Sequence, residues 1–171
     1  MSLESFIRAM PKVELHVHLG GAIVPETLLL LARQNGTDLP AQTIEELREW
    51  YRFTDFAHFI EVYKRVQECI TTADDIELIA REFLAGQARQ GVRYTEITHS
   101  APRYDVPFRD QLRALNSASR WALTELGVAS ALILDIPREF DAEDGLQVAD
   151  WAMLVSGGTS TSLSWPNSAP A

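Results

Sequence analysis

The sequence predicts an α/β protein built around a parallel sheet. Short apolar runs that suit strands alternate with longer segments of helical periodicity. Helix stop signals, among them Asn35-Gly36 and Gly127, fall between the two kinds of segment. Strands separated by helices are joined by right-handed crossovers and therefore run parallel. We expect three such strands, at residues 13–19, 92–98 and 129–136.

Helices are expected after each strand. The first starts near Pro25, which suits a first helical turn, and ends at Asn35-Gly36. A helical insertion follows, opened by a capping box of Thr43 and Glu46. It continues with an amphipathic face at helical spacing, formed by Phe56, Phe59, Ile60, Tyr63, Val66 and Ile70. Further helices are expected at 73–91, 108–126 and 142–155.

The amino-acid composition indicates which kinds of binding partner to expect. Lys and Arg number 15 against 24 Asp and Glu, for a formal net charge of -9. This balance argues against nucleic acid as a ligand and against an anionic membrane surface. The single cysteine, Cys69, excludes an internal disulfide and favours a reducing compartment. With no apolar run long enough to cross a bilayer, we expect an unexported, cytoplasmic protein.

The end of the chain differs from the rest. Asp150 is the last charged residue, and from Ser156 onward the sequence is rich in Ser, Thr, Gly and Pro without apolar periodicity. We therefore expect one folded region at residues 1–155 and a disordered tail at 156–171.

The most informative motif contains the expected first strand. Residues 11–22 read PKVELHVHLGGA, with His16 and His18 two positions apart. Alternate residues of a strand point to the same side, so the two imidazoles should lie side by side. At the carboxyl end of a parallel strand such a pair can bind a divalent ion. The other interpretation is a pair of surface or core histidines.

In these residues the chain resembles the adenosine deaminase family, zinc-dependent (β/α)8 barrels of the amidohydrolase superfamily. Its first strand typically reads P-K-x-E-L-H-x-H-L-x-G. Supporting matches follow in order at residues 53–59, 88–91, 92–97 and 132–135, so that the resemblance covers about residues 8–155. The resemblance implies an incomplete barrel with about three of the eight strands and a helical insertion after the first.

The resemblance also implies a reaction. Zinc-bound water attacks C6 of an adenine ring and ammonia leaves. His16 and His18 would be two zinc ligands, and His18 would also lie close to the substrate sugar. Family members often carry an acidic residue directly after the H-x-H-L segment to contact the ribose, and this chain has Gly20 at that position. The substrate expected is therefore a purine base or nucleoside: adenosine, adenine or a modified nucleoside.

Other residues have two interpretations. In the family, the region of Phe56, Phe59 and Ile60 lines the entrance to the purine pocket, but an aromatic stripe at helical spacing is more often core. His58 falls off that stripe and should be exposed. His99 lies just beyond the second strand, where a rim position suits either a ligand contact or ordinary packing. Asp135 either faces the barrel mouth or begins a loop before Pro137.

Much of the family's machinery has no counterpart here. The resemblance calls for a third histidine ligand, a general-acid Glu in an H-x-G-E segment, a further His and a late Asp pair. No histidine follows His99, and no H-x-G-E occurs. A complete barrel takes at least about 200 residues and eight strands. We therefore expect a truncated chain that is inactive alone and has no catalytic residue of its own.

One consequence, one alternative and one exclusion follow from the incomplete barrel. Unpaired edges of a three-stranded sheet predict self-association. The alternative function is a noncatalytic α/β module that binds metal or a partner through His16 and His18. A cytidine-deaminase type of zinc site is excluded, because it needs P-C-x-x-C and the chain has one cysteine.

Overall fold

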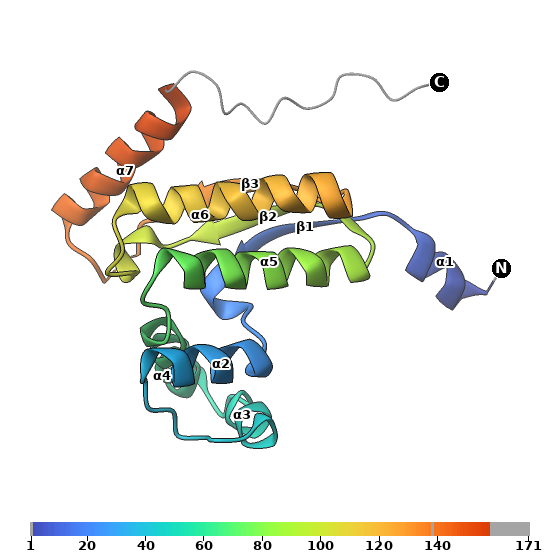
Figure 1. Ribbon diagram of the computed structural model, residues 1–171, viewed down its shortest axis with the longest axis horizontal. Coiled ribbons are helices and arrows are strands. Elements are labelled where there is room, and N and C mark those ends of the chain that lie inside the picture. The colour runs from blue at the N-terminus through green and yellow to red at the C-terminus, as the bar shows by residue number, and fades with distance from the viewer. Residues whose placement is uncertain (1, 138, 158–171) are drawn as a thin grey trace. The chain divides into compact units, whose positions relative to one another are not determined.

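The structure is a computed structural model and describes residues 2–137 and 139–157. It divides into two compact units, Met1–Asp135 and Ile136–Ala171. The first unit confirms the predicted α/β class. It holds a parallel three-stranded sheet in the order β1-β2-β3 (Figure 1). The carboxyl ends of all three strands therefore meet at one edge of the sheet.

The strands are β1 (Lys12–His18), β2 (Val92–His99) and β3 (Ala129–Leu134). β2 and β3 pair without interruption, from Tyr94 opposite Ala129 to His99 opposite Leu134. The register between β1 and β2 is irregular at two places. β3 ends two residues earlier than the sequence predicts, although the amide of Asp135 still donates to the carbonyl of His99 at 3.4 Å.

Two long helices pack side by side on one face of the sheet (Figure 1): α5 (Ala73–Arg89) and α6 (Phe108–Trp121). Their buried faces follow the helical period that the sequence shows. The buried apolar residues of the two helices are Ile76, Ile79, Ala80, Phe83, Leu84, Ala114, Leu115 and Ala118. The chain stays helical beyond α6, but Ala122–Leu126 form a π-helical turn that ends at Gly127 with φ 66°.

The helical insertion after β1 is confirmed. A 3-10 turn (Leu19–Gly21) leads into α2 (Pro25–Asn35), α3 (Ile44–Trp50) and α4 (Phe56–Glu68). α2 ends at Gly36, whose φ of 66° is the left-handed conformation that glycine adopts without strain. The predicted capping box at α3 is present, with the Thr43 side chain accepting from the Glu46 amide and the Glu46 carboxylate accepting from the Thr43 amide.

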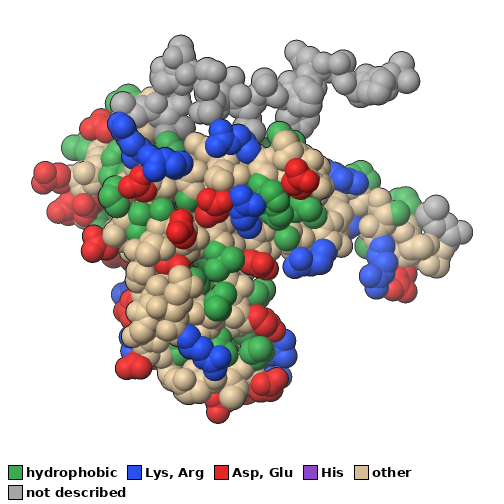
Figure 2. Space-filling view, viewed as in Figure 1, with side chains coloured by type: hydrophobic (Ala, Val, Ile, Leu, Met, Phe, Trp, Pro, Cys, Tyr) green, Lys and Arg blue, Asp and Glu red, His purple; other side chains and the backbone are tan. Residues whose placement is uncertain are grey.

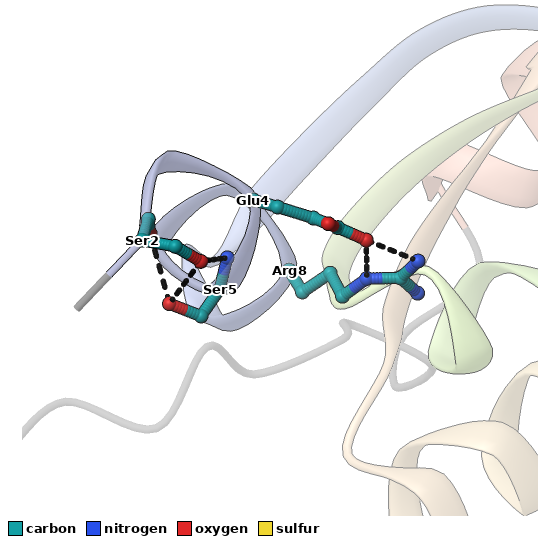
Figure 3. Close-up of polar contacts among 4 residues, drawn as sticks. All are labelled: Ser2, Glu4, Ser5 and Arg8. Atoms are coloured by element: carbon teal, nitrogen blue, oxygen red, sulfur yellow. Dashed lines mark hydrogen bonds and ion pairs between the residues drawn. The ribbon is translucent and has the colours of Figure 1, made fainter.

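One helix was not expected from the sequence, α1 (Leu3–Ala9), which precedes β1. The Ser2 hydroxyl caps it by accepting from the amide of Ser5 at 3.1 Å (Figure 3). Arg8 and Glu4 form an ion pair one turn apart, with nitrogen and oxygen 2.9 Å from each other. No residue of α1 is buried, so local capping and charge pairing are what the structure offers for its stability.

The second unit contains α7 (Ala142–Gly157). The carboxylate of Asp141 accepts from the amides of Glu143 and Asp144 at 2.9 and 3.0 Å, which starts the helix. α7 extends two residues into the segment for which we expected a tail. The rest of that expected tail, 158–171, lies outside the described residues.

Among the described residues, no helix combines the length and the apolar character that a membrane crossing requires. On the face shown in Figure 2, acidic and basic side chains alternate over the region of α5 and α6 and do not gather into one basic patch.

Candidate functional site

His16 and His18 lie together at the carboxyl end of β1, as the sequence predicts. Their ring centroids are 5.2 Å apart and the rings are tilted by 44°. His16 is exposed and His18 half-buried, so both rings can be reached from solvent. Two adjacent imidazoles offer nitrogen donors of the type that zinc prefers.

The backbone that presents the pair is not a regular strand. Glu14 pairs with Thr95 and Val17 with Ile97, so β1 carries one residue more than β2 over this stretch. His16, inside this bulge, has φ 60°, a conformation that costs a non-glycine residue about 1–3 kcal/mol. Regular alternation was our reason for expecting neighbouring rings. The structure instead brings them together around a strained bulge, and such strain is concentrated at functional sites.

The turn after His18 is covered by helix α4. A β-carbon at Gly20 would lie 2.6 Å from both Cδ and Oε1 of Gln67, too close to be accommodated. A β-carbon at Gly21 would instead meet the Tyr63 ring at 3.5 Å. Tyr63 and Gln67 are one turn apart on α4, so their side chains lie over the two glycines. The residue that we expected near the substrate, Gly20, is therefore buried beneath Gln67.

Aromatic rings continue from Tyr63 toward solvent. Centroid distances are 6.1 Å between Tyr63 and Phe59, 6.1 Å between Phe59 and Phe56, and 5.1 Å between Phe59 and Phe53. Phe59 and Ile60 are half-buried, but Phe56 is 76% exposed, which corrects our expectation that this stripe is mostly core. The guanidinium carbon of Arg103, which follows β2, lies 5.5 Å from the Tyr63 ring centroid.

His58 is half-buried rather than exposed as we expected. It lies in the first turn of α4, where its amide donates to the Asp55 side chain at 2.8 Å. Its ring nitrogen Nδ1 accepts from the amide of Thr54 at 3.3 Å. The Asp55 side chain thus caps α4, and the His58 ring holds Thr54, the residue before the cap.

His99 is fully buried at the end of β2. Its Nε2 lies 2.7 Å from Oε1 of Gln111, and its ring stacks on Tyr104 with centroids 5.0 Å apart. Gln111 donates through Nε2 to the carbonyls of Ala101 and Val106, so its oxygen accepts from His99. Nε2 of His99 therefore carries a proton. Burial lowers the pKa of His99 and so favours the neutral ring, opposed by the hydrogen bond to Gln111 and by the charge of Asp135.

Several buried polar atoms at this edge have no hydrogen-bond partner among the described residues. They include Nδ1 of His99, Oγ1 of Thr98, Oδ1 of Asp135 and both polar atoms of the Gln67 carboxamide. Asp135 was expected either to face the barrel mouth or to begin a loop. Its backbone amide donates a hydrogen bond to the His99 carbonyl, which keeps it next to β2. Unsatisfied polar atoms are uncommon in protein interiors, so those near the strand ends make this edge the candidate binding region.

The described residues contain no group of three or more His, Cys, Asp or Glu side chains placed to hold a metal ion. His16 and His18 therefore fit zinc in donor type and proximity, but they supply two ligands where a catalytic zinc usually takes three from the protein. Sequence reasoning found this pair and missed Gln67, because no local signal connects residues 20 and 67.

A parallel sheet covered by helices on one face, with imidazoles at the carboxyl end of its first strand, is the architecture of part of a (β/α) barrel enzyme. Solved structures of deaminases and related enzymes share this fold. An adenine deaminase from Arthrobacter aurescens matches with a TM-score of 0.74 at 32% identity, over 85% of this chain and 45% of that one. A zinc-bound amidohydrolase from Burkholderia ambifaria matches with a TM-score of 0.79 at 27% identity, over 92% and 43%.

Sequence comparison identifies the family. The model of the adenosine deaminase family matches residues 11–164. Adenine deaminase of Bordetella avium is 32% identical over 159 residues, 88% of this chain and 49% of that protein. Aminodeoxyfutalosine deaminase of Streptomyces avermitilis is 39% identical over 145 residues, 82% of this chain and 40% of that protein. The chain belongs to the adenosine deaminase family and spans less than half the length of these relatives.

Proposed function

We propose that this chain is the N-terminal, metal-binding portion of a deaminase that removes the amino group of adenosine or a related purine. The observation that carries the proposal is the imidazole pair of His16 and His18, 5.2 Å apart on a strained bulge at the carboxyl end of β1. Adenine is the substrate named for two of the similar proteins and aminodeoxyfutalosine for a third, which supports a purine as the common chemical class.

In this proposal the two imidazoles supply two positions of a zinc site. When bound, zinc lowers the pKa of a coordinated water to about 7 and so makes a nucleophile available near neutral pH. The chain's own contribution is to hold the imidazoles at fixed spacing. The rings of Phe59 and Tyr63 give a flat, largely apolar wall of the kind that purine pockets use. The buried, neutral His99 adds no positive charge beside the metal ligands.

Zinc binding to the 171-residue chain tests this proposal. We expect weak binding of one zinc ion per chain, because two ligands are fewer than the usual three or four. His16→Ala should abolish the binding, while His58→Ala, which removes an imidazole at the start of α4, should leave it unchanged. The measurement is titration calorimetry followed by metal analysis after dialysis. Equal zinc binding by wild type and His16→Ala would show that the pair is not the metal site.

The single cysteine bears on where the protein is located. We infer a reducing, cytoplasmic environment from the single cysteine, whose thiol is buried and donates to the carbonyl of Arg65 at 3.5 Å.

A further inference from the structure

The side chain of Gln67 occupies the space that a side chain at Gly20 would fill, although the two residues belong to different elements. The carboxamide of Gln67 reaches from α4 into the space that a side chain at residue 20 would take. Its Nε2 comes closest to the position of the absent β-carbon, and its Cδ and Oε1 each lie 2.6 Å from that position. Any larger residue at position 20 would have to displace it. The polar group next to Gly20 therefore comes from a residue of α4 that lies 47 positions further along the chain.

The Gln67 carboxamide is held in an unfavourable state. Its side chain is 94% buried, since 6% of the residue is exposed, yet neither its nitrogen nor its oxygen has a hydrogen-bond partner among the described residues. A buried amide without partners destabilises the fold, whereas a methionine of similar shape would be far less costly there.

We propose that Gln67 is a specificity-determining residue that stands in for the side chain missing at Gly20 and hydrogen-bonds a sugar hydroxyl of the purine nucleoside. The inference rests on the proposed function, since it places the purine beside His18. A carboxamide carries one donor and one acceptor group, and a hydroxyl offers both in return. Because the carboxamide is uncharged, it recognises the hydroxyl without the negative charge that an acidic residue at position 20 would bring.

The position of Gln67 favours the sugar over the base. The reacting carbon of the purine has to lie at the metal ligands, His16 and His18. Gly20 is two residues beyond His18, up to about 7 Å away along the chain. A group at that distance meets the far side of the purine, where the sugar is attached. Contact requires the Gln67 side chain to rotate toward the substrate, which its three side-chain torsions allow.

Stability measurements separate a binding role from a structural one. Gln67→Met keeps the volume and removes the unpaired amide, so we expect unfolding to shift to higher urea concentration. Gln111→Met is the matched control, because the Gln111 amide is fully bonded to His99, Ala101 and Val106. That variant should unfold at lower urea concentration. If Gln67→Met destabilises the chain as Gln111→Met does, the amide is structural and the inference is wrong.

Ligand titration followed by NMR tests the contact directly. Adenosine should shift the side-chain amide signals of Gln67 and the ring signals of His18, whereas adenine, which lacks hydroxyls, should shift only those of His18. Gln67→Met should weaken adenosine binding about tenfold, the loss of roughly one hydrogen bond, and leave adenine binding unchanged.

The outcomes distinguish two failures. Adenosine that shifts His18 but not Gln67, or that binds Gln67→Met as well as wild type, overturns the inference and leaves the proposed function standing. A chain that binds neither purine contradicts the proposed function and the inference together.

Discussion

His99 is a single buried residue whose environment has a measurable consequence. Burial is the main cause that lowers its pKa in the folded chain, while an unfolded histidine titrates near 6.5. As pH falls below about 6.5, the unfolded chain takes up the proton before the folded chain does. The stability of the fold should therefore decrease as pH falls through this range.

Urea unfolding at pH 7.5 and 5.5 tests this effect. His99→Gln keeps a polar group toward Gln111 and removes the titrating ring, at a cost of about 1–3 kcal/mol at pH 7.5. The loss of stability between the two pH values should be smaller in His99→Gln than in wild type. His58→Gln serves as the control for the removal of one histidine at a half-buried position. An unchanged pH dependence in His99→Gln would show that His99 is not held neutral by burial.

At the residue scale, local sequence explains only part of the site. The H-x-H spacing predicts a pair of neighbouring imidazoles, and the structure contains one. The positive φ of His16 has no sequence signal, because it depends on how β1 pairs with β2. The contact of Gln67 with Gly20 and the bond of His99 to Gln111 join residues far apart in the chain, and only the folded arrangement of helices and strands determines them.

Among the elements, the start of α5 depends most clearly on one side chain. Oδ2 of Asp75 accepts from the amides of Thr71 and Thr72 at 3.0 and 2.9 Å and from Nδ2 of Asn35 at 2.9 Å. One carboxylate thus caps α5 and joins it to the end of α2. Asp75 is almost fully buried, so water cannot replace these bonds.

Asp75→Ala should lower the free energy of unfolding by about 2–4 kcal/mol, because a cap and a buried hydrogen-bond acceptor are lost together. The neighbouring Asp74→Ala, at an exposed position of the same turn, should change it by less than about 1 kcal/mol. Chemical denaturation of both variants measures the difference. Equal effects at the two positions would contradict the proposed link between α5 and α2.

Elements were more predictable than residue contacts. Capping boxes, glycine stops and apolar periodicity are local signals, and they located α2 through α6 and the three strands. α1 was missed because it has no buried face, and periodic burial was our main signal for a helix. The ends of the elements differ by a few residues, as expected where pairing with a neighbour decides where a strand stops.

For the whole molecule, the three-stranded sheet leaves β1 and β3 as edge strands. On β1, Val13 and Leu15 are 62% and 57% exposed. An exposed apolar edge of a parallel sheet is a site for pairing with another chain. We therefore propose that isolated chains associate through this edge.

Sedimentation velocity over a range of concentrations tests the association. Wild type should show a concentration-dependent increase in mass, and Leu15→Lys should reduce it, because a charge on an edge strand opposes pairing. Leu30→Lys, at an equally exposed apolar position of α2, is the control and should associate like wild type. Equal association of wild type and Leu15→Lys would exclude β1 as the contact.

We propose that this chain supplies the metal-binding strand and one wall of a purine deaminase site, and that its described residues do not by themselves form a complete catalytic site. Ammonia release from adenosine and adenine by the purified 171-residue chain with added zinc tests this most directly. We expect no release above that of buffer containing zinc. Ammonia release by the chain that disappears in His16→Ala would contradict the claim, because it would show that these residues already form a complete catalytic site.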